Sequence, residues 1–131
     1  MSNRVAFVTG GAQGIGQGIS ETLGINGFRV AVADLNLDAA EATAKRITDA
    51  GGEAIAVRVD VTDTASVQGA VKTVEAELGD IEIVVNNAGW DDFMPLLKTS
   101  EDFWDKILDI NFKGSLLVIQ AVAPGMVERG F

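Results

Sequence analysis

Four short apolar runs alternate along this 131-residue chain with longer segments in which apolar residues recur at helical spacing. The runs cover residues 5–8, 28–33, 54–59 and 81–85, and the helical segments cover about 14–25, 37–50, 63–78 and 101–129. Each run is almost continuously apolar, which is typical of strands that crossover helices bury on both faces. Because such crossovers are right-handed, the simplest topology is an α/β fold with a three-layer αβα doubly wound parallel sheet.

The last helical segment and the loop before it carry further expectations. Beyond Asn86 we expect a loop as far as residues 99–100. Pro124 predicts a break or kink in the helix that follows, because proline lacks a backbone donor and its ring clashes with the preceding turn. Apolar side chains of this segment are expected to face inward, namely Phe103, Ile107, Ile110, Leu117 and Val118.

The composition excludes several classes of function. The chain has 19 acidic and 10 basic residues, a formal net charge of −9 and no run of Lys or Arg, so nucleic acid and anionic membranes are poor candidate partners. It has no cysteine, histidine or tyrosine, which removes disulfides, thiolate nucleophiles, the usual nitrogen and sulfur metal sites, and His or Tyr acid/base catalysis. We predict no metal site, since any metal would need oxygen ligands alone.

The first residues lead directly into the first apolar run. We see neither a signal-peptide h-region with a cleavage site nor an 18-residue apolar span. The expectation is therefore a soluble, cytoplasmic protein with no membrane partner.

The turn between the first run and the first helical segment is rich in glycine and reads TGGAQGIG over residues 9–16. Free backbone N–H groups and the positive end of the helix dipole would face an anion there, and glycines allow the backbone to approach it closely. The pattern predicts a pyrophosphate site, and a tight turn without a ligand is the alternative. The candidate binding residues are Gly10, Gln13, Gly14, Ile15 and Gly16.

Asp34 ends the second run, 18 residues after Gly16. This spacing is close to the roughly 20 residues expected of an acid that binds an adenosine ribose. Its carboxylate would repel a 2′-phosphate, and neither Gln13, Leu35 nor Asn36 supplies a cation to neutralise one. The sequence therefore predicts NAD rather than NADP, with Asp34 and Leu35 in its site. A strand-end turn or helix cap is the other interpretation of Asp34.

Two further strand ends carry polar residues. Asp60 and Val61 follow the third run and could reach the adenine edge, although a plain loop aspartate explains Asp60 nearly as well. Asn87, Ala88 and Gly89 follow the fourth run, where doubly wound sheets bind cofactors. An Asx turn is the alternative for this segment.

Together these motifs resemble those of the short-chain dehydrogenase/reductase family. Residues 9–16 fit its TGxxxGxG pattern, residues 60–61 its adenine-contacting pair, residues 86–89 its NNAG motif, and Asn111 its helix asparagine. The resemblance covers the whole chain and implies an NAD(P)-binding Rossmann fold whose glycines and acids hold the dinucleotide. It also implies that NNAG steadies the central sheet and lines the cofactor site, and that Asn111 holds a water in a proton relay. Asn111 would then be the one catalytic residue of this chain.

The sequence also departs from the family pattern. Family members carry a serine on the next strand and a Tyr-x-x-x-Lys pair on the helix after it, and this sequence ends before both. We therefore expect residues 1–131 to form a single NAD-binding Rossmann domain, truncated to about four strands, incomplete at the C-terminus and inactive alone. The parent protein is expected to be a homo-oligomeric, NAD-dependent oxidoreductase that transfers a hydride between NAD and a secondary alcohol or ketone.

The substrate is indicated only by the residues after Gly89. Trp90 and Phe93 could present apolar surface to a ring or an acyl chain, although such residues more often pack a loop against a helix. The run at residues 86–91 is also similar to the branch that oxidises cyclic hydroxyacyl-CoA esters, close to the 3-oxoacyl reductases. A cyclic or acyl-thioester hydroxy compound is therefore one candidate substrate.

Two other functions compete with this one. A non-catalytic NAD-binding sensor or interaction module of 131 residues would explain the missing active site. An S-adenosylmethionine-dependent methyltransferase would also use Asp34 and Asp60 at successive strand ends. Those enzymes commonly have an acidic or amide residue followed by prolines where this chain has residues 86–89.

Overall fold

Four parallel strands form the central sheet of the computed structural model, which describes residues 3–131. The strands are β1 (Val5–Thr9), β2 (Arg29–Asp34), β3 (Glu53–Arg58) and β4 (Ile81–Asn86). The crossover helices are α1 (Gly14–Ile25), α2 (Leu37–Asp49) and α3 (Thr64–Glu77). After β4 come a 3-10 turn η1 (Leu96–Lys98), α4 (Glu101–Leu108), a π-helical turn η2 (Asp109–Lys113) and α5 (Gly114–Arg129).

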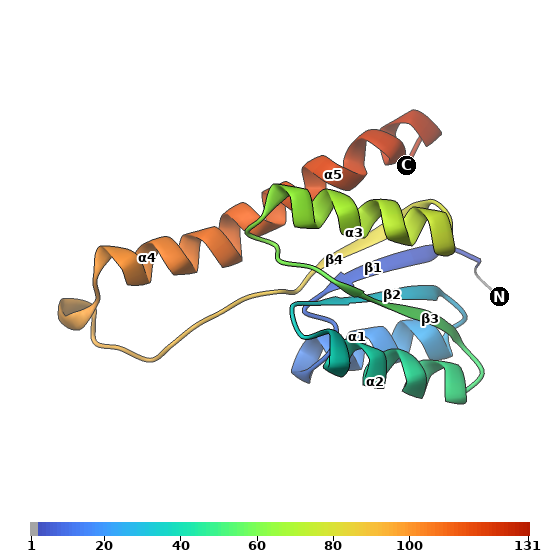
Figure 1. The fold of residues 1–131 in the computed structure, drawn as a ribbon, viewed down its shortest axis with the longest axis horizontal. Helices are drawn as coiled ribbons and strands as arrows, with labels where there is room; N and C mark the ends of the chain where they lie inside the picture. Colours follow the sequence, from blue (N-terminus) through green and yellow to red (C-terminus); the bar gives the residue numbers. More distant parts are fainter. Residues whose placement is uncertain (1–2) are drawn as a thin grey trace.

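The sheet has the strand order β3-β2-β1-β4, and every neighbouring pair is parallel. The chain moves outward from β1 to β3 and then returns across β1 to β4. As a result α1 and α2 cover one face of the sheet, and α3 and α5 cover the other (Figure 1). This arrangement confirms the predicted three-layer doubly wound sheet. Because the strand order reverses beside β1, the carboxyl ends of β1 and β4 flank the crevice where such sheets bind ligands.

The strands fill an apolar core on each face of the sheet. All five residues of β1 are buried. Phe7 belongs to the core cluster that contains Val74 of α3 and Val118 of α5, whereas Val8 belongs to the cluster that contains Ile47 of α2. Successive side chains of a strand point to opposite faces, so a sheet covered on both sides requires strands without polar interruptions.

The helix ends follow the sequence signals. The side chain of Asn36 accepts a hydrogen bond from the Ala39 N–H and so caps α2. Gly51 and Gly79, which follow α2 and α3, have φ values of 88° and 97°, in the left-handed region that glycine adopts without strain.

The last helical segment differs from its prediction. Pro124 predicts a break or kink, and the break is absent, because α5 continues through Pro124 to Arg129. An irregularity that was not predicted lies at η2, where a π-helical turn replaces regular α-helix between α4 and α5. Of the five side chains predicted to face inward, Val118 is buried in the core and the partly buried Ile110 and Leu117 pack against it, whereas Phe103 and Ile107 are partly exposed and lie outside this core. The loop predicted after Asn86 contains η1.

The helical stretch Glu101–Arg129 is long and apolar enough to cross a membrane by length and composition alone, which the sequence analysis did not anticipate. The core helices of many soluble proteins meet the same criterion, although only 17% of the most apolar window is buried here. Val118 and Val122 pack into the core beside β4 and α3, whereas α4 projects beyond the sheet (Figure 1).

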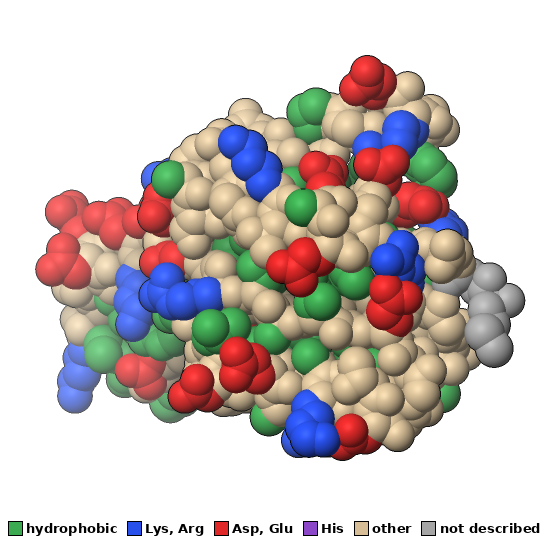
Figure 2. Space-filling view, turned by 45° about the vertical axis from the view of Figure 1, so that its right-hand side comes forward, with side chains coloured by type: hydrophobic (Ala, Val, Ile, Leu, Met, Phe, Trp, Pro, Cys, Tyr) green, Lys and Arg blue, Asp and Glu red, His purple; other side chains and the backbone are tan. Residues whose placement is uncertain are grey.

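Charged side chains are interspersed on the surface. On the face shown in Figure 2, Lys and Arg side chains lie singly or in small groups among acidic ones, without an extended basic patch. This distribution accompanies the formal net charge of −9.

Candidate functional site

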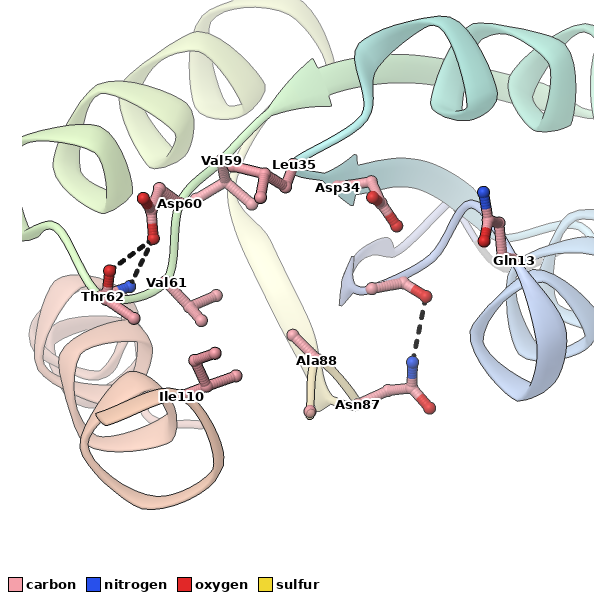
Figure 3. A pocket seen from close by; sticks show the side chains of 12 residues that line it. Gln13, Asp34, Leu35, Val59, Asp60, Val61, Thr62, Asn87, Ala88 and Ile110 are labelled. Carbon is pink, nitrogen blue, oxygen red and sulfur yellow. Dashed lines mark hydrogen bonds between the residues drawn. The ribbon is translucent and has the colours of Figure 1, made fainter. Parts of the chain in front are cut away.

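A cleft of about 470 Å³ opens at the carboxyl ends of the strands (Figure 3). It is lined by Gly10, Gln13, Asp34, Leu35, Val59, Asp60, Val61, Thr62, Asn87, Ala88, Gly89 and Ile110. The cleft therefore brings together residues from the ends of all four strands and from η2, and most of the residues predicted to bind a cofactor lie in its wall. The predicted residues that do not line it are Gly14, Ile15, Gly16 and Asn111.

The glycine turn has the geometry that close backbone packing requires. Gly10 has a φ of 61°, and a Cβ there would lie 2.9 Å from the Cα of Ala88. Gly16 is buried beneath the turn, where a Cβ would overlap the carbonyl oxygen of Gly10. Gly14 has a φ of 53°, and a Cβ there would meet nothing within 4 Å, while Ile15 is 79% exposed. The first turn of α1 thus presents open backbone N–H groups beside the cleft.

Asn87 ties the end of β4 to this turn. Its amide nitrogen donates hydrogen bonds to the carbonyl oxygens of Thr9 (3.1 Å) and Gly10 (3.0 Å). The backbone N–H groups of Asn87 and Ala88 both donate to the hydroxyl of Thr9 at 3.1 Å. The amide nitrogen of Asn87 is therefore committed to β1 and its turn, while Asn87, Ala88 and Gly89 line the cleft.

The carboxylate of Asp34 is held on both sides. Oδ2 accepts a hydrogen bond from the Ala12 N–H (3.1 Å), and Oδ1 accepts one from the Asn36 N–H (3.0 Å). Each carboxylate oxygen has two acceptor positions, so both keep capacity for a further donor. No Lys or Arg is among the described residues that line the cleft. The site can accept hydroxyl donors beside Asp34 and offers no counter-charge for a phosphate there.

Asp60 is fixed by Thr62 at the opposite end of the cleft (Figure 3). Its Oδ1 accepts hydrogen bonds from the Thr62 hydroxyl (2.6 Å) and from the Thr62 N–H (2.9 Å). The bond from the Thr62 hydroxyl, and next the bond from the Thr62 N–H, hold the pKa of Asp60 below its usual value. Partial burial raises this pKa, and the positive charge of Arg58 lowers it by a smaller amount. Asp60 is therefore ionised at neutral pH and oriented. Val61 and Ile110 form an apolar wall next to it.

Asn111 lies in η2 and contacts the segment after the NNAG motif. Its Oδ1 accepts a hydrogen bond from the Trp90 N–H (2.7 Å), and its Nδ2 donates to the Trp90 carbonyl (2.9 Å). The Trp90 ring meets Phe103 edge-on at 5.6 Å, and the Lys106 ammonium lies 3.6 Å from the centre of the indole ring. Phe93 is fully exposed. The amide of Asn111 thus holds the Trp90 backbone.

Three residues of the cleft were missed by the sequence analysis. Val59 and Thr62 lie on either side of the predicted pair, Asp60 and Val61. Thr62 could have been found from the sequence, because it is a hydroxyl residue two positions after an aspartate at a strand end. Ile110 has no such signal, because its position depends on the π-helical turn. Among residues 3–131, no group of three or more His, Cys, Asp or Glu side chains lies close enough to hold a metal ion.

Comparison with known proteins identifies the family. A family model described as short chain dehydrogenase matches residues 4–131. The chain belongs to the short-chain dehydrogenase family. Similar curated relatives of this short-chain dehydrogenase chain are a galactitol 2-dehydrogenase of Agrobacterium fabrum (38% identical), a sorbitol dehydrogenase of Cereibacter sphaeroides (40%) and a D-threitol dehydrogenase of Mycolicibacterium smegmatis (42%). The alignments cover 98–99% of this chain and 49–50% of the relatives. The chain therefore spans about half the length of these relatives.

Solved structures agree with the family assignment. A protein of Novosphingobium aromaticivorans described as a short-chain dehydrogenase superposes with a TM-score of 0.91 at 36% identity, over 98% of this chain and 47% of the other. A protein of Sinorhizobium meliloti described as a short-chain alcohol dehydrogenase gives a TM-score of 0.92 at 34% identity, over 98% and 51%. The short-chain dehydrogenase resemblance and the Rossmann-type fold are thereby confirmed.

Proposed function

We propose that this chain forms the NAD-binding half of an NAD-dependent oxidoreductase that transfers a hydride between NAD and a secondary alcohol or ketone. The observation that carries the proposal is the Asp34 carboxylate, fixed by two backbone donors at the wall of a cleft whose described lining has no cation. A carboxylate in this setting favours a ribose with free hydroxyls and repels a 2′-phosphate. NAD is therefore favoured over NADP.

The residues present fit a dinucleotide. Close backbone contacts at Gly10 and the open space at Gly14 leave a cradle at the N-terminus of α1 that a side chain would fill. Backbone N–H groups at a helix N-terminus suit a pyrophosphate. Val61 and Ile110 offer an apolar wall for a flat ring near the oriented Asp60. When bound, NAD supplies the hydride acceptor or donor, and these residues bind and orient it.

For catalysis and substrate binding, fewer residues of this chain can be assigned than for the cofactor site. We assign Asn111 to the catalytic set of the whole protein, acting beside the Trp90 backbone that its amide holds. The names of the similar relatives favour a small polyol or other secondary alcohol as substrate. A cyclic or acyl-thioester hydroxy compound is the second candidate, and the exposed Phe93 beyond Trp90 offers it apolar surface.

The whole protein is proposed to be a cytoplasmic homo-oligomer that binds neither nucleic acid nor membrane. Exposed apolar side chains on α4, η2 and α5 support self-association, namely Trp104, Leu108, Phe112 and Ile119. The net charge of −9 and the interspersed surface charges argue against a polyanionic partner (Figure 2).

The direct test is NADH formation by the full-length protein with a panel of secondary alcohols. The panel should contain galactitol, sorbitol, D-threitol, 2,3-butanediol and a cyclic hydroxyacyl thioester. We expect turnover with at least one of them, and we expect Asp34→Ala to raise the KM for NAD about tenfold while kcat changes little.

Asp38→Ala is the matched control, because Asp38 is exposed in the first turn of α2 and does not line the cleft. The proposal fails if no alcohol supports NADH formation, and NAD binding without turnover would favour the binding-module interpretation. An Asp34→Ala variant with an unchanged KM for NAD would refute the role given to Asp34.

A further inference from the structure

Two buried hydroxyl groups hold the backbone of the glycine turn. The Gly11 carbonyl accepts a hydrogen bond from the Ser20 hydroxyl of α1 (3.2 Å), and the Ala12 carbonyl accepts one from the Thr43 hydroxyl of α2 (3.1 Å). Ser20 and Thr43 are fully buried, and neither lines the cleft. The turn is thus anchored from behind by both helices that cover this face of the sheet.

The hydroxyl proton of Thr43 has a fixed direction. The Arg46 guanidinium donates a hydrogen bond from Nη2 to the Thr43 hydroxyl oxygen (2.9 Å). Because a guanidinium has no acceptor, the Thr43 proton must point to the Ala12 carbonyl. Arg46 is itself held by Glu21, whose Oε1 accepts from Arg46 Nε (2.8 Å) and from Gln17 (2.9 Å). A charged donor on a hydroxyl oxygen polarises the group and strengthens the bond that the hydroxyl donates.

Ala12 therefore has an anchor at each of its peptide groups. Its N–H donates to the Asp34 carboxylate and its carbonyl accepts from Thr43. Ala12 is only 2% exposed, so water has little access to replace a lost partner. The next residue, Gln13, lines the cleft together with Asp34. The bond from Thr43 thus fixes Ala12, which is covalently linked to Gln13 and hydrogen-bonded to Asp34.

We propose that Thr43 is a positioning residue for the adenosine end of the NAD site, acting through the Ala12 peptide on Asp34 and Gln13. This inference rests on the proposed function. Without the hydroxyl, the buried Ala12 carbonyl loses its partner and the turn relaxes toward other donors. The affinity for the dinucleotide then decreases, because binding requires the glycine turn and Asp34 to keep their present relative positions.

The test is titration of the full-length protein and its variants with NAD and with ADP-ribose, which lacks the nicotinamide. Thr43→Val keeps the shape and removes the hydroxyl, and we expect it to weaken the affinity for both ligands about fivefold, the effect of one net hydrogen bond. Thr43→Ser keeps the hydroxyl and removes a methyl group, so its affinity should stay within about twofold of the wild type even if its melting temperature falls. A role in packing alone would give the reverse order.

Thr48→Val is the matched control on the same helix, because the exposed Thr48 hydroxyl donates a hydrogen bond to the Lys45 carbonyl within α2 and does not touch the glycine turn among the described contacts. If Thr43→Val does not fold, Thr43→Ser and Thr43→Ala form the decisive pair, since both lack the methyl group and only the first keeps the hydroxyl. Equal affinities in that pair, or a wild-type affinity in Thr43→Val, would overturn the inference and leave the proposed function standing. A wild type that binds no dinucleotide would overturn both, and a loss confined to NAD would contradict the placement at the adenosine end.

Discussion

Gly16 offers a sharp test of the glycine turn. A Cβ at this position would overlap the Gly10 carbonyl oxygen and the Asn87 amide nitrogen, and would lie 2.8 Å from the Gly10 carbonyl carbon. These groups are also hydrogen-bonded to each other at 3.0 Å. Gly16→Ala must therefore push the turn away from α1 by roughly 1 Å and weaken the bond that ties the turn to β4.

The expected cost follows from this geometry. Overpacking of a rigid backbone contact typically lowers the free energy of unfolding by about 1–3 kcal/mol. The loss of a buried hydrogen bond adds about 1 kcal/mol. We expect a total near 2–4 kcal/mol, a fall in melting temperature of roughly 5–10 °C, and a weaker affinity for NAD.

Gly18→Ala is the matched control on the same helix. A Cβ at Gly18 meets nothing within 4 Å, so alanine should stabilise α1 by about 0.5–1 kcal/mol. Urea unfolding and NAD titration of both variants make the comparison. A Gly16→Ala protein with the stability and NAD affinity of the wild type would refute the close packing that the structure shows at this turn.

Two further predictions concern the cleft and its rim. Thr62→Val should raise the pKa of Asp60 toward its usual value, because the hydroxyl hydrogen bond that lowers it is lost. The lowered pKa in the folded state stabilises the protein above pH about 4, and this contribution disappears as the pH falls. The variant should therefore lose less stability than the wild type on acidification. Carboxyl titration by NMR measures this pKa, and an unchanged pKa would contradict the assigned cause. Asn111→Ala should free the Trp90 backbone and lower the kcat of the full-length protein. In the 131-residue chain with Trp104→Phe, where Trp90 is the one indole left, Asn111→Ala should shift the emission to the red, whereas an unaltered spectrum and kcat would remove Asn111 from this role.

The strand runs and helix ends could be predicted from the sequence because their causes are local. Continuous apolar runs identified the strands that helices cover on both faces. Asn36 marked the start of α2 as a capping residue, and Gly51 marked its end because glycine adopts left-handed backbone without strain. The glycine spacing, Asp34 and the polar residues after β3 and β4 indicated the cleft for the same reason, since every residue that lines it except Ile110 lies at or just after the end of a strand.

What could not be predicted depends on contacts between distant segments. The sequence placed a disturbance at Pro124, but the π-helical turn lies at residues 109–113, where Asn111 bonds to the Trp90 backbone 21 residues away. The Thr43 bond to the Ala12 carbonyl spans 31 residues and has no periodic signal. The position of Ile110 in the cleft wall likewise depends on the π-helical turn in which it lies.

Calorimetric titration of the full-length protein with NAD and with NADP measures whether Asp34 selects the dinucleotide. We expect NAD to bind, and to bind at least about tenfold more tightly than NADP, because Asp34 accepts from ribose hydroxyls and no described cleft residue neutralises a 2′-phosphate. Equal or tighter binding of NADP, or binding of neither dinucleotide, would contradict this expectation.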